Sequence, residues 1–286
     1  MNIIKQSILN KVIKQRESNT HKGNYGRLLI IGGSPNYGGA VIMAAEGALN
    51  SGAGLICVAT HSINVSALHA RDPEIMFLDW HDEKGLKQMI PQMDVIVCGM
   101  GLGNDKYAKN ILLTLKNYVT PNQSIVFDAS ALDLMAQDKS LILQQAKNII
   151  LTPHQMEWQR LSQIHIPYQS DSANLEALNN LFPNKNAYLI LKSNHTKIYD
   201  SNGEFFENPI GNPGMAIGGM GDTLAGIVGG FIGQFGADIE TLQAAVYLHS
   251  LAADEIYRNH YIVRPTKLSA SLPFLMKKYG SKDEEN

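Results

Sequence analysis

Short apolar segments alternate with longer segments of helical spacing along most of this chain. The apolar segments are rich in Val, Ile and Leu and cover residues 27–31, 55–60, 74–78, 94–100, 124–130, 148–153 and 187–193. Helical spacing lies between most of them, for example at 40–51, 106–118 and 174–181. Strands that are apolar on both faces are typical of a parallel sheet with helices on both sides. The alternation therefore predicts one doubly wound α/β domain with a mostly parallel sheet.

Composition narrows the class of protein. Of the 286 residues, 44% are hydrophobic and 17% are charged, which is typical of a globular protein that needs no disulfide or metal to fold. The formal charge of −2 argues against general electrostatic attraction to nucleic acid or to anionic lipid. The two cysteines, Cys57 and Cys98, each end an apolar segment, and this predicts buried, reduced thiols in a cytoplasmic protein.

The remaining segments complete the expected domain, which spans residues 1–286. Residues 1–20 have the spacing of an amphipathic helix and lack the apolar core of a signal peptide, and 281–286 form a solvated tail. Residues 194–207 predict two strands joined by a turn at 200–203, so we expect a small β-hairpin there. The chain from residue 221 onward is predicted to be helical.

Ligands of open α/β sheets bind beyond the carboxyl ends of the strands, so the residues that follow the apolar segments are the informative ones. Paired glycines at 32–33 and 38–39 connect a strand to a helix, without the Lys-Ser/Thr of a Walker A loop. Segment 98–106 holds three more glycines but not a complete dinucleotide fingerprint. Each of these two segments is also explained by a tight turn.

A helix start is predicted directly after the segment 148–153. Thr152 suits the N-cap, Pro153 the first helical position, and Gln155 completes a capping box. This start places His154 and Glu157 on one helix face, near the positive end of the helix dipole. His154 is equally explained as a partly buried polar residue.

The glycine-rich segment 212–233 is the strongest functional signal. Glycines crowd 218–221 and lead into a helix that has Asp222 at its entrance. Free amides at such a turn form an anion pocket, and a carboxylate beside that pocket repels the anion it attracts. We therefore interpret Asp222 as a group that accepts a proton from an attacking hydroxyl, the alternative being a structural N-cap.

Four segments together resemble the ADP- or ATP-dependent NAD(P)H-hydrate dehydratases of the ribokinase-like superfamily. They are HKGNYGRLLIIGGSPNYGGA, LTPHQMEWQRL, KSNHTKI and NPGMAIGGMGDTLAGIVGGF, and the likeness extends from about residue 22 to 275. The resemblance implies a three-layer α/β sandwich of the single-domain bacterial type, because the length leaves no room for the epimerase domain of bifunctional relatives.

The resemblance also implies a reaction. Hydrated NADH or NADPH (NADHX, NADPHX) would be phosphorylated on its ring hydroxyl by ADP, with Mg²⁺ bridging the phosphates. Elimination of phosphate would then restore the cofactor and leave AMP. A homo-oligomer, a tetramer in particular, is implied as well.

Residue roles follow from the same resemblance. Asp222 would be the catalytic base, and an anion hole would hold the transferring phosphoryl group. The hydrate pocket would comprise Ala40, Gly103, His154 and Asp222. The nucleotide site would comprise Lys192, Ser193, Asn194, His195, Thr196 and Gly221, and the anion hole Gly219, Met220 and Gly221. Glu157 would contact the metal through water.

Two positions depart from the pattern of the family. Met220 stands where relatives often have Thr or Ser, which shifts the anion-binding role toward backbone amides. Met156 stands where relatives often have Gly, which alters packing at the mouth of the pocket. Neither departure removes a side chain to which a chemical role is assigned, because Met220 would act in the anion hole through its backbone amide.

Three other function classes fit parts of the sequence. An ATP-dependent hydroxyl kinase for a vitamin precursor or a sugar would share the fold and the anion pocket. A nucleotide-binding sensor would share the fold, but it gains nothing from an acid beside the phosphate. A dinucleotide-dependent dehydrogenase fits less well, because no complete GxGxxG follows the first strand.

Overall fold

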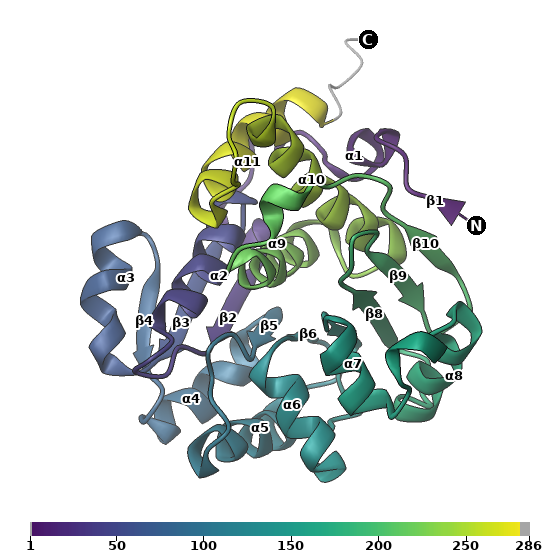
Figure 1. Cartoon of the computed structure of the whole chain (residues 1–286). Coiled ribbons are helices and arrows are strands. Elements are labelled where there is room, and N and C mark those ends of the chain that lie inside the picture. Colours follow the sequence, from purple (N-terminus) through teal and green to yellow (C-terminus); the bar gives the residue numbers. More distant parts are fainter. Residues whose placement is uncertain (1, 281–286) are drawn as a thin grey trace.

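The computed structural model describes residues 2–280. In this part of the chain the strands form one ten-stranded sheet in the order β1-β10-β9-β8-β7-β6-β5-β2-β3-β4 (Figure 1). The strands are β1 Asn2–Ile3, β2 Arg27–Ile31, β3 Leu55–Thr60, β4 Met76–Asp79, β5 Val95–Cys98, β6 Ser124–Phe127, β7 Asn148–Leu151, β8 Ala187–Leu191, β9 Lys197–Asp200 and β10 Phe205–Glu207.

Helices alternate with the strands and then follow one another at the carboxyl end. The α-helices are α1 Ser7–Val12, α2 Gly38–Asn50, α3 Val65–Arg71, α4 Glu83–Met89, α5 Lys106–Tyr118, α6 Ser130–Gln137, α7 Gln155–Ser162, α8 Asp171–Leu181, α9 Met220–Phe235, α10 Ile239–Tyr257 and α11 Pro265–Tyr279. Short 3₁₀ turns occupy Lys22–Tyr25, Ser62–Asn64, Ile90–Gln92, Lys139–Leu141, Ile166–Tyr168 and Pro213–Met215.

The order of the parallel strands reverses between β2 and β5. From β4 to β8 every neighbouring pair is parallel, whereas β8, β9 and β10 pair antiparallel. The chain runs from β2 toward β4 on one side of this point and from β5 toward β8 on the other. Such a reversal opens a crevice at the carboxyl ends of the two central strands, and this is where ligands of doubly wound sheets bind.

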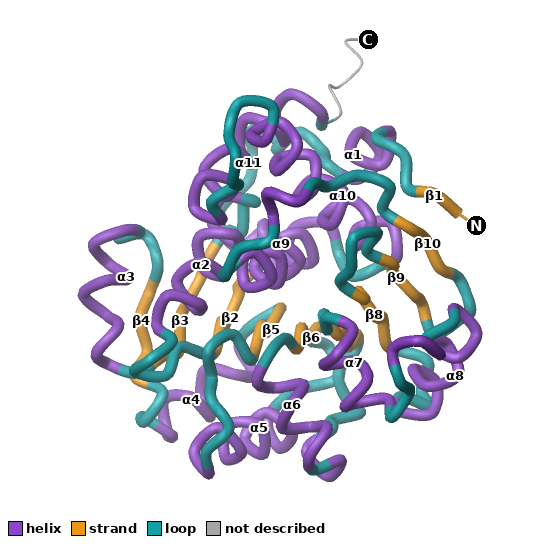
Figure 2. The backbone as a smooth tube through the Cα atoms, viewed as in Figure 1, coloured by secondary structure: helices purple, strands orange, loops and turns teal. Residues whose placement is uncertain are grey.

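Each face of the sheet is covered by its own set of helices, as Figures 1 and 2 show. On β2, Leu28 and Ile30 pack into a core with α2, α9, α10 and α11, whereas Leu29 and Ile31 face a second core with α5, α6, α7 and α8. This alternation is the two-residue period of a strand buried on both sides. The predicted doubly wound, mostly parallel architecture is confirmed.

The small hairpin is also confirmed. Strands β9 and β10 pair antiparallel, and the amide of Gly203 closes the turn by donating to the carbonyl of Asp200 at 2.9 Å. Of the predicted strands, 27–31 and 55–60 match the structure, and 74–78 lies one or two residues later, as β4. The helix expected over residues 1–20 is wrong in its extent.

Only Ser7–Val12 of that segment is helical. The chain before α1 adds β1 to the edge of the sheet, parallel to β10, and the amide of Ile4 donates to the carbonyl of Glu207. The edge of a sheet has unpaired backbone groups, so the first residues of the chain gain hydrogen-bond partners by joining it as a strand. The local spacing of apolar residues does not reveal the presence of that edge. Leu9 and Val12 are buried, so the amphipathic face itself was predicted correctly.

Two further expectations concern the environment of the chain. Cys57 and Cys98 are both buried and free, as predicted. Among residues 2–280, none of the helices combines the length and the apolar character needed to span a bilayer. The predicted tail at 281–286 lies outside the described residues.

Candidate active site

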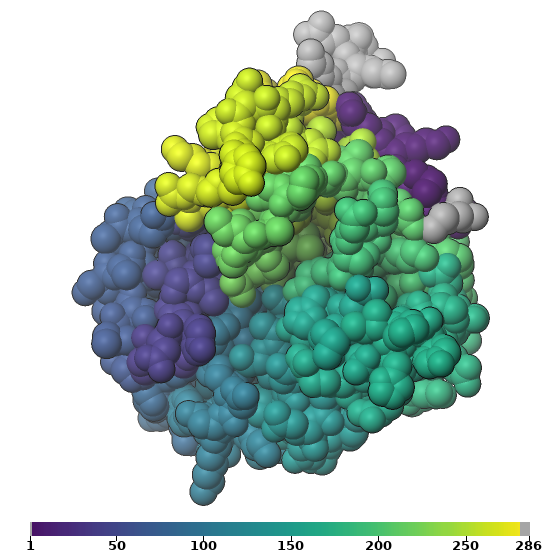
Figure 3. Space-filling view, in the orientation of Figure 1, coloured from purple at the N-terminus to yellow at the C-terminus, as the bar shows by residue number. Residues whose placement is uncertain are grey.

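The glycine turns that follow β2 and β5 meet at the reversal point of the sheet. The amide of Gly33 donates to the carbonyl of Met100 at 2.9 Å, and that of Ser34 donates to the carbonyl of Gly101 at 2.7 Å. A Cβ atom on Gly32 would lie 2.1 Å from the Met100 carbonyl oxygen, so the two turns can approach this closely only without a side chain there. The recessed surface in the middle of the face seen in Figure 3 lies between green and teal segments of the chain.

Helix α9 presents its amino end at the same edge of the sheet. It begins at Met220, and its N-cap is Gly219 with φ +92°, a left-handed conformation that favours glycine. The first amides of a helix have no partner within the helix, so this end attracts anions. Asp222 lies in the first turn and is not the N-cap, so the alternative weighed from the sequence, a structural N-cap, is wrong.

The carboxyl group of Asp222 is suited to accept a proton near neutral pH. Its pKa is raised to about 6, mostly by burial and also by the nearby Asp128, with Lys192 opposing the rise. A base whose pKa lies close to the working pH is ionised and yet able to take up a proton. This combination of burial and charged neighbours is common at catalytic positions.

Lys192 is fixed by a buried carboxylate. Its Nζ lies 2.7 Å from Oδ1 of Asp128, and the Lys192 side chain is 19% exposed whereas that of Asp128 is 2% exposed. The same Oδ1 accepts a hydrogen bond of 2.9 Å from the hydroxyl of Thr152. Asp128 follows β6, Thr152 follows β7 and Lys192 follows β8, so three neighbouring strand ends build this arrangement.

The ammonium group of Lys192 lies beneath the start of α9. A Cβ atom on Gly221 would be 3.0 Å from Nζ, so the absence of a side chain at 221 leaves the ammonium group open toward the helix start. Burial lowers the pKa of Lys192, but Asp128, Glu157 and Asp222 outweigh burial and hold that pKa above its usual value. The positive charge of Lys192 therefore interacts with all three carboxylates.

His154 and Glu157 form the start of α7, in a way that differs from the prediction. The N-cap is His154, whose Nδ1 accepts from the amide of Glu157 at 3.3 Å, while Oε2 of Glu157 accepts from the amide of His154 at 2.8 Å. The expected N-cap at Thr152, helical Pro153 and capping box with Gln155 are therefore wrong. The backbone is still paired with the neighbouring strand at this point, because the amide of Lys192 donates to the carbonyl of Pro153 and residues 154 and 192 form a parallel bridge.

The protonation of this pair follows from its surroundings. Burial raises the pKa of Glu157 to about 7, with Asp128 adding to the rise and Lys192 opposing it. Burial, followed by the charge of Lys192, lowers the pKa of His154. The His154 ring is half exposed, and its Nε2 lies 3.4 Å from Oε1 of Glu157. The His154 imidazole is therefore accessible to a ligand, whereas the Glu157 carboxylate is buried beneath it.

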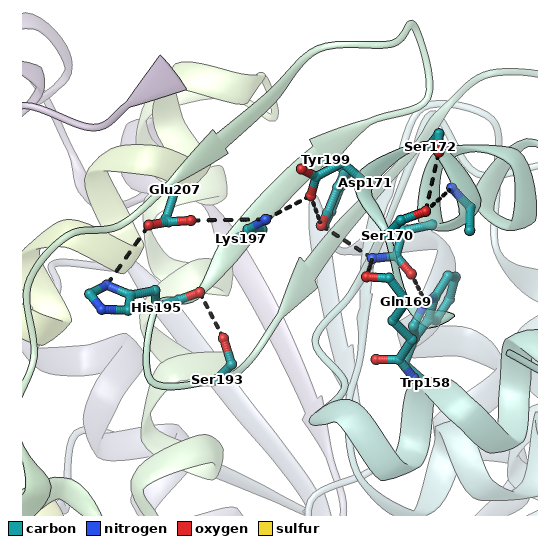
Figure 4. Close-up of polar contacts among 12 residues, drawn as sticks. Trp158, Gln169, Ser170, Asp171, Ser172, Ser193, His195, Lys197, Tyr199 and Glu207 are labelled. Carbon is teal, nitrogen blue, oxygen red and sulfur yellow. Dashed lines mark hydrogen bonds and ion pairs between the residues drawn. The ribbon is translucent and has the colours of Figure 1, made fainter. Parts of the chain in front are cut away.

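The predicted nucleotide loop is a turn that its own hydrogen bonds hold in shape. The hydroxyl of Ser193 donates to the carbonyl of His195 at 2.7 Å, and the hydroxyl of Thr196 donates to the carbonyl of Ser193 at 3.4 Å. Asn194 at the tip is exposed. His195 is half exposed and has Nδ1 3.9 Å from Glu207, as Figure 4 shows. Lys192 links this turn to the acidic groups around Asp222.

A polar network connects the loop to α7. Beyond the loop, Lys197 Nζ lies 2.8 Å from Oδ1 of Asp171, and the hydroxyl of Tyr199 donates to the same oxygen at 2.7 Å (Figure 4). Asn174 donates to that hydroxyl at 3.2 Å and accepts from the indole of Trp158 at 2.8 Å. The loop and the helix that begins at His154 are thereby fixed relative to each other.

Ala40 and Gly103, the small residues predicted to line the hydrate pocket, lie on the β2–β5 side. Ala40 is in the first turn of α2, and its Cβ would be 3.1 Å from a Cβ atom on Gly101. The amide of Gly103 donates to the hydroxyl of Ser130 at 3.2 Å. Met43 lies one turn further along α2 and would be 2.3 Å from a Cβ atom on Gly219. The first turns of α2 therefore adjoin the start of α9.

The sequence analysis missed two residues of this site. Asp128 directly follows an apolar strand, so the rule that singled out the other strand ends would have found it. His249 lies inside α10, where only its polarity on an apolar face marks it. It is 4% exposed, and burial lowers its pKa to about 4, with the Met220 backbone opposing the shift. A neutral imidazole therefore supports the start of α9.

The site fits Mg²⁺ only in company with phosphate. Among residues 2–280 no group of three or more His, Cys, Asp and Glu side chains is arranged to hold a metal ion. Mg²⁺ keeps several waters and commonly takes its other ligands from one or two carboxylates and from substrate phosphates. Glu157 is buried among Lys192, Asp128 and Asp133, and its contact with such an ion through water stays a prediction.

Comparison with known proteins identifies the family. The family model described as NAD(P)H-hydrate dehydratase matches residues 28–274. The chain belongs to the NAD(P)H-hydrate dehydratase family. A curated family member from Enterococcus faecalis, named ADP-dependent (S)-NAD(P)H-hydrate dehydratase, is 44% identical over 280 residues, which are 98% of this chain and 94% of that protein.

Solved structures agree with this assignment to the NAD(P)H-hydrate dehydratases. A crystal structure of a ribokinase-like superfamily protein from Enterococcus faecalis has a TM-score of 0.94 at 44% identity, covering 99% of this chain and 97% of that chain. The ADP/ATP-dependent NAD(P)H-hydrate dehydratase of Bacillus subtilis, crystallised with ATP and Mg²⁺, has a TM-score of 0.83 at 24% identity, covering 97% and 98% of the two chains. The expected ribokinase-like fold is confirmed.

Proposed function

We propose that this protein is an ADP-dependent (S)-NAD(P)H-hydrate dehydratase, which returns hydrated NADH or NADPH to the reduced cofactor and releases AMP and phosphate. The observation that carries this proposal is the placement of Asp222. It lies in the first turn of α9, beside free helix amides and above Lys192, in a member of a family with that activity. The geometry combines a base, an anion-binding helix end and a fixed cation.

The chemistry proceeds in two steps. Asp222 takes the proton of the ring hydroxyl while the oxygen attacks the terminal phosphorus of ADP, and AMP leaves. The amides of residues 219–221 and the Lys192 ammonium group stabilise the charge on the transferring phosphoryl group. The phosphate ester is then a good leaving group. The electron pair of the ring nitrogen expels it together with the C–O bonding pair, and loss of a proton from the adjacent ring carbon restores the double bond. Hydroxide itself leaves poorly, so the phosphoryl transfer makes the elimination possible.

The two substrates approach from opposite sides of Asp222. We assign the nucleotide to Lys192, Ser193, Asn194, His195, Thr196 and Gly221, because this turn is rigid and has the fixed cation at its base. We assign the hydrate to Ala40, Gly103, His154 and Asp222, where the glycine turns leave backbone open to a flat ring. Mg²⁺ would be held by substrate phosphates and would supply positive charge against the charge that develops during the transfer. Glu157 would contact that ion through water.

The direct test is a repair assay. Purified protein is mixed with NADHX, Mg²⁺ and ADP or ATP, and the return of reduced-nicotinamide absorbance is followed. We expect recovery with ADP and stoichiometric formation of AMP. No recovery with either nucleotide would contradict the proposal, and accumulation of a stable phosphate ester would instead indicate a hydroxyl kinase.

Location and assembly remain predictions. A cytoplasmic location is supported by two buried, free thiols, which suit a reducing compartment. The homotetramer rests on the family resemblance alone. Light scattering of the purified protein tests it, with a mass of four chains as the expected result.

A further inference from the structure

Four rings gather at the carboxyl ends of β3 and β4, away from Asp222. They belong to His61, Trp80, His81 and Tyr107, which we call the aromatic cluster. Ring centroids are 4.7 Å apart for His81 and Tyr107, 5.3 Å for His61 and His81, and 5.6 Å for Trp80 and Tyr107. Trp80 is buried and forms the base, whereas the His81 side chain is 51% exposed. The cluster therefore offers ring surface to solvent.

The aromatic cluster adjoins the segments that form the proposed hydrate pocket. The hydroxyl of Thr60, the residue before His61, donates to the carbonyl of Gly33 at 2.9 Å, and the amide of Trp80 donates to the carbonyl of Thr60 at 3.1 Å. Ser34 adjoins this contact, and its Cβ would be 4.0 Å from a Cβ atom on Gly103. Three strand spacings separate β5 from β4, which is about 14 Å along the edge of the sheet.

The polar groups of the cluster suit a neutral base and not a phosphate. Burial raises the pKa of Tyr107 to about 12, with Glu83, Asp79 and Asp105 adding to the rise, so carboxylates face this ring. Nδ1 of His61 accepts from the amide of Ile63 at 3.1 Å, which places the proton of the neutral imidazole on Nε2. Nε1 of Trp80 is buried and has no partner among the described residues. The cluster thus combines ring faces with imidazole and indole N–H groups.

We propose that the aromatic cluster binds the adenine base of the dinucleotide substrate. This inference rests on the proposed function, because a hydrated dinucleotide has a second nucleoside that must lie beyond the ring pocket. Bases stack on aromatic side chains, and such a contact contributes about 1–3 kcal/mol for each base. His81 and Tyr107 supply the stacking surface, and His61 supplies a hydrogen-bond donor at its edge.

A truncated substrate separates this role from general effects on the enzyme. We would measure kcat and KM for NADHX and for the hydrate of reduced nicotinamide mononucleotide, which lacks the adenosine half. His81→Ala and Tyr107→Leu are expected to raise KM for NADHX about tenfold or more, in line with the loss of one stacking contact. Neither variant should change KM for the mononucleotide hydrate or for ADP, and Tyr107→Phe should behave as the wild type.

Tyr118→Leu is the matched control, because Tyr118 is an exposed tyrosine at the other end of the same helix, α5. It should leave every constant unchanged. An unchanged KM for NADHX in both cluster variants would overturn the inference, as would an equal rise of KM for the mononucleotide hydrate. If the wild-type protein restores neither hydrate, the proposed function itself fails, and this inference fails with it.

Discussion

Lys192 is the residue on which the charge balance of the site depends. Its positive charge interacts with Asp128, Glu157 and Asp222. Asp128 forms an ion pair with it, with 2.7 Å between Oδ1 and Nζ. A buried ion pair is stable only when both members are present, since the loss of one leaves an uncompensated charge. The three carboxylates therefore behave as one unit whose properties change together.

Asp222→Asn is expected to lower kcat for NADHX by about 10²–10⁴-fold, the range typical of a lost general base. The substitution keeps the shape of the side chain and removes its ability to take the proton. Binding of ADP, measured by titration calorimetry, should be retained or strengthened, because a negative charge beside the phosphates is gone. A variant with undiminished kcat would remove Asp222 from the mechanism.

Asp128→Asn is expected to lower kcat/KM for ADP about tenfold or more. The amide cannot balance the charge of Lys192, so the ammonium group is no longer fixed beneath Gly221. The double variant with Lys192→Met should be no worse than Lys192→Met alone, because Asp128 acts through the lysine. Asp94→Asn, which removes a partly exposed partner of Arg27 just before β5, is the control and should leave the kinetics unchanged. If the double variant lowers kcat/KM for ADP by the product of the two single effects, Asp128 does not act through Lys192.

The raised pKa of Asp222 predicts a dependence of stability on pH. Its folded-state pKa of about 6 lies above the ordinary value of 3.8, so the folded state binds the proton more tightly than the unfolded chain does. This group therefore lowers the stability of the fold as pH rises through about 4 to 6. Asp222→Asn should unfold at a higher temperature than the wild type at pH 8, and the difference should shrink by pH 5. A melting temperature at pH 8 that is lower for the variant than for the wild type would show that ionised Asp222 does not destabilise the fold.

At the scale of elements, the sequence was informative where local pattern decides the structure. The parallel strands and helices α5, α9 and α10 follow from apolar periodicity, which reports burial directly. The start of α7 did not follow, because bonds from β8, about 40 residues away, keep residues 152–154 in the sheet. The strand β1 was missed for the same reason, since its partner β10 is about 200 residues distant.

The contact between α2 and α9 gives a prediction at this scale. A Cβ atom on Gly226 would lie 1.8 Å from the carbonyl oxygen of Ala44, so the two helix backbones meet there. Gly226→Ala is expected to lower the free energy of unfolding by about 1–3 kcal/mol or more, the cost of overpacking. Gly39→Ala, at the start of α2 where a Cβ meets nothing within 4 Å, is the control and should be neutral or mildly stabilising. Chemical denaturation measures both, and equal stability of the two variants would contradict the close contact.

At the scale of the whole molecule, the fold brings together segments that the sequence analysis treated separately. The strand-end rule located Gly33, Gly103 and His154 as candidates, the glycine-rich segment located Asp222, and the fold places these segments around one crevice. The strand-end rule did not reveal that Asp128 and Thr152 fix Lys192, because side-chain partners on different strands leave no joint pattern in a single sequence. The predicted nucleotide loop likewise has no sequence feature that separates it from an ordinary turn, and the position of Lys192 beneath α9 comes only from the fold.

The most direct test of the central claim follows one oxygen atom. NADHX is prepared with ¹⁸O in the ring hydroxyl and incubated with the protein, Mg²⁺ and ADP, and the released phosphate is examined by mass spectrometry. Phosphorylation of the hydroxyl followed by elimination predicts one ¹⁸O atom in each phosphate formed along with NADH. Unlabelled phosphate, with the ¹⁸O recovered in water, would show that the hydroxyl leaves without ever receiving the phosphoryl group and would contradict the account.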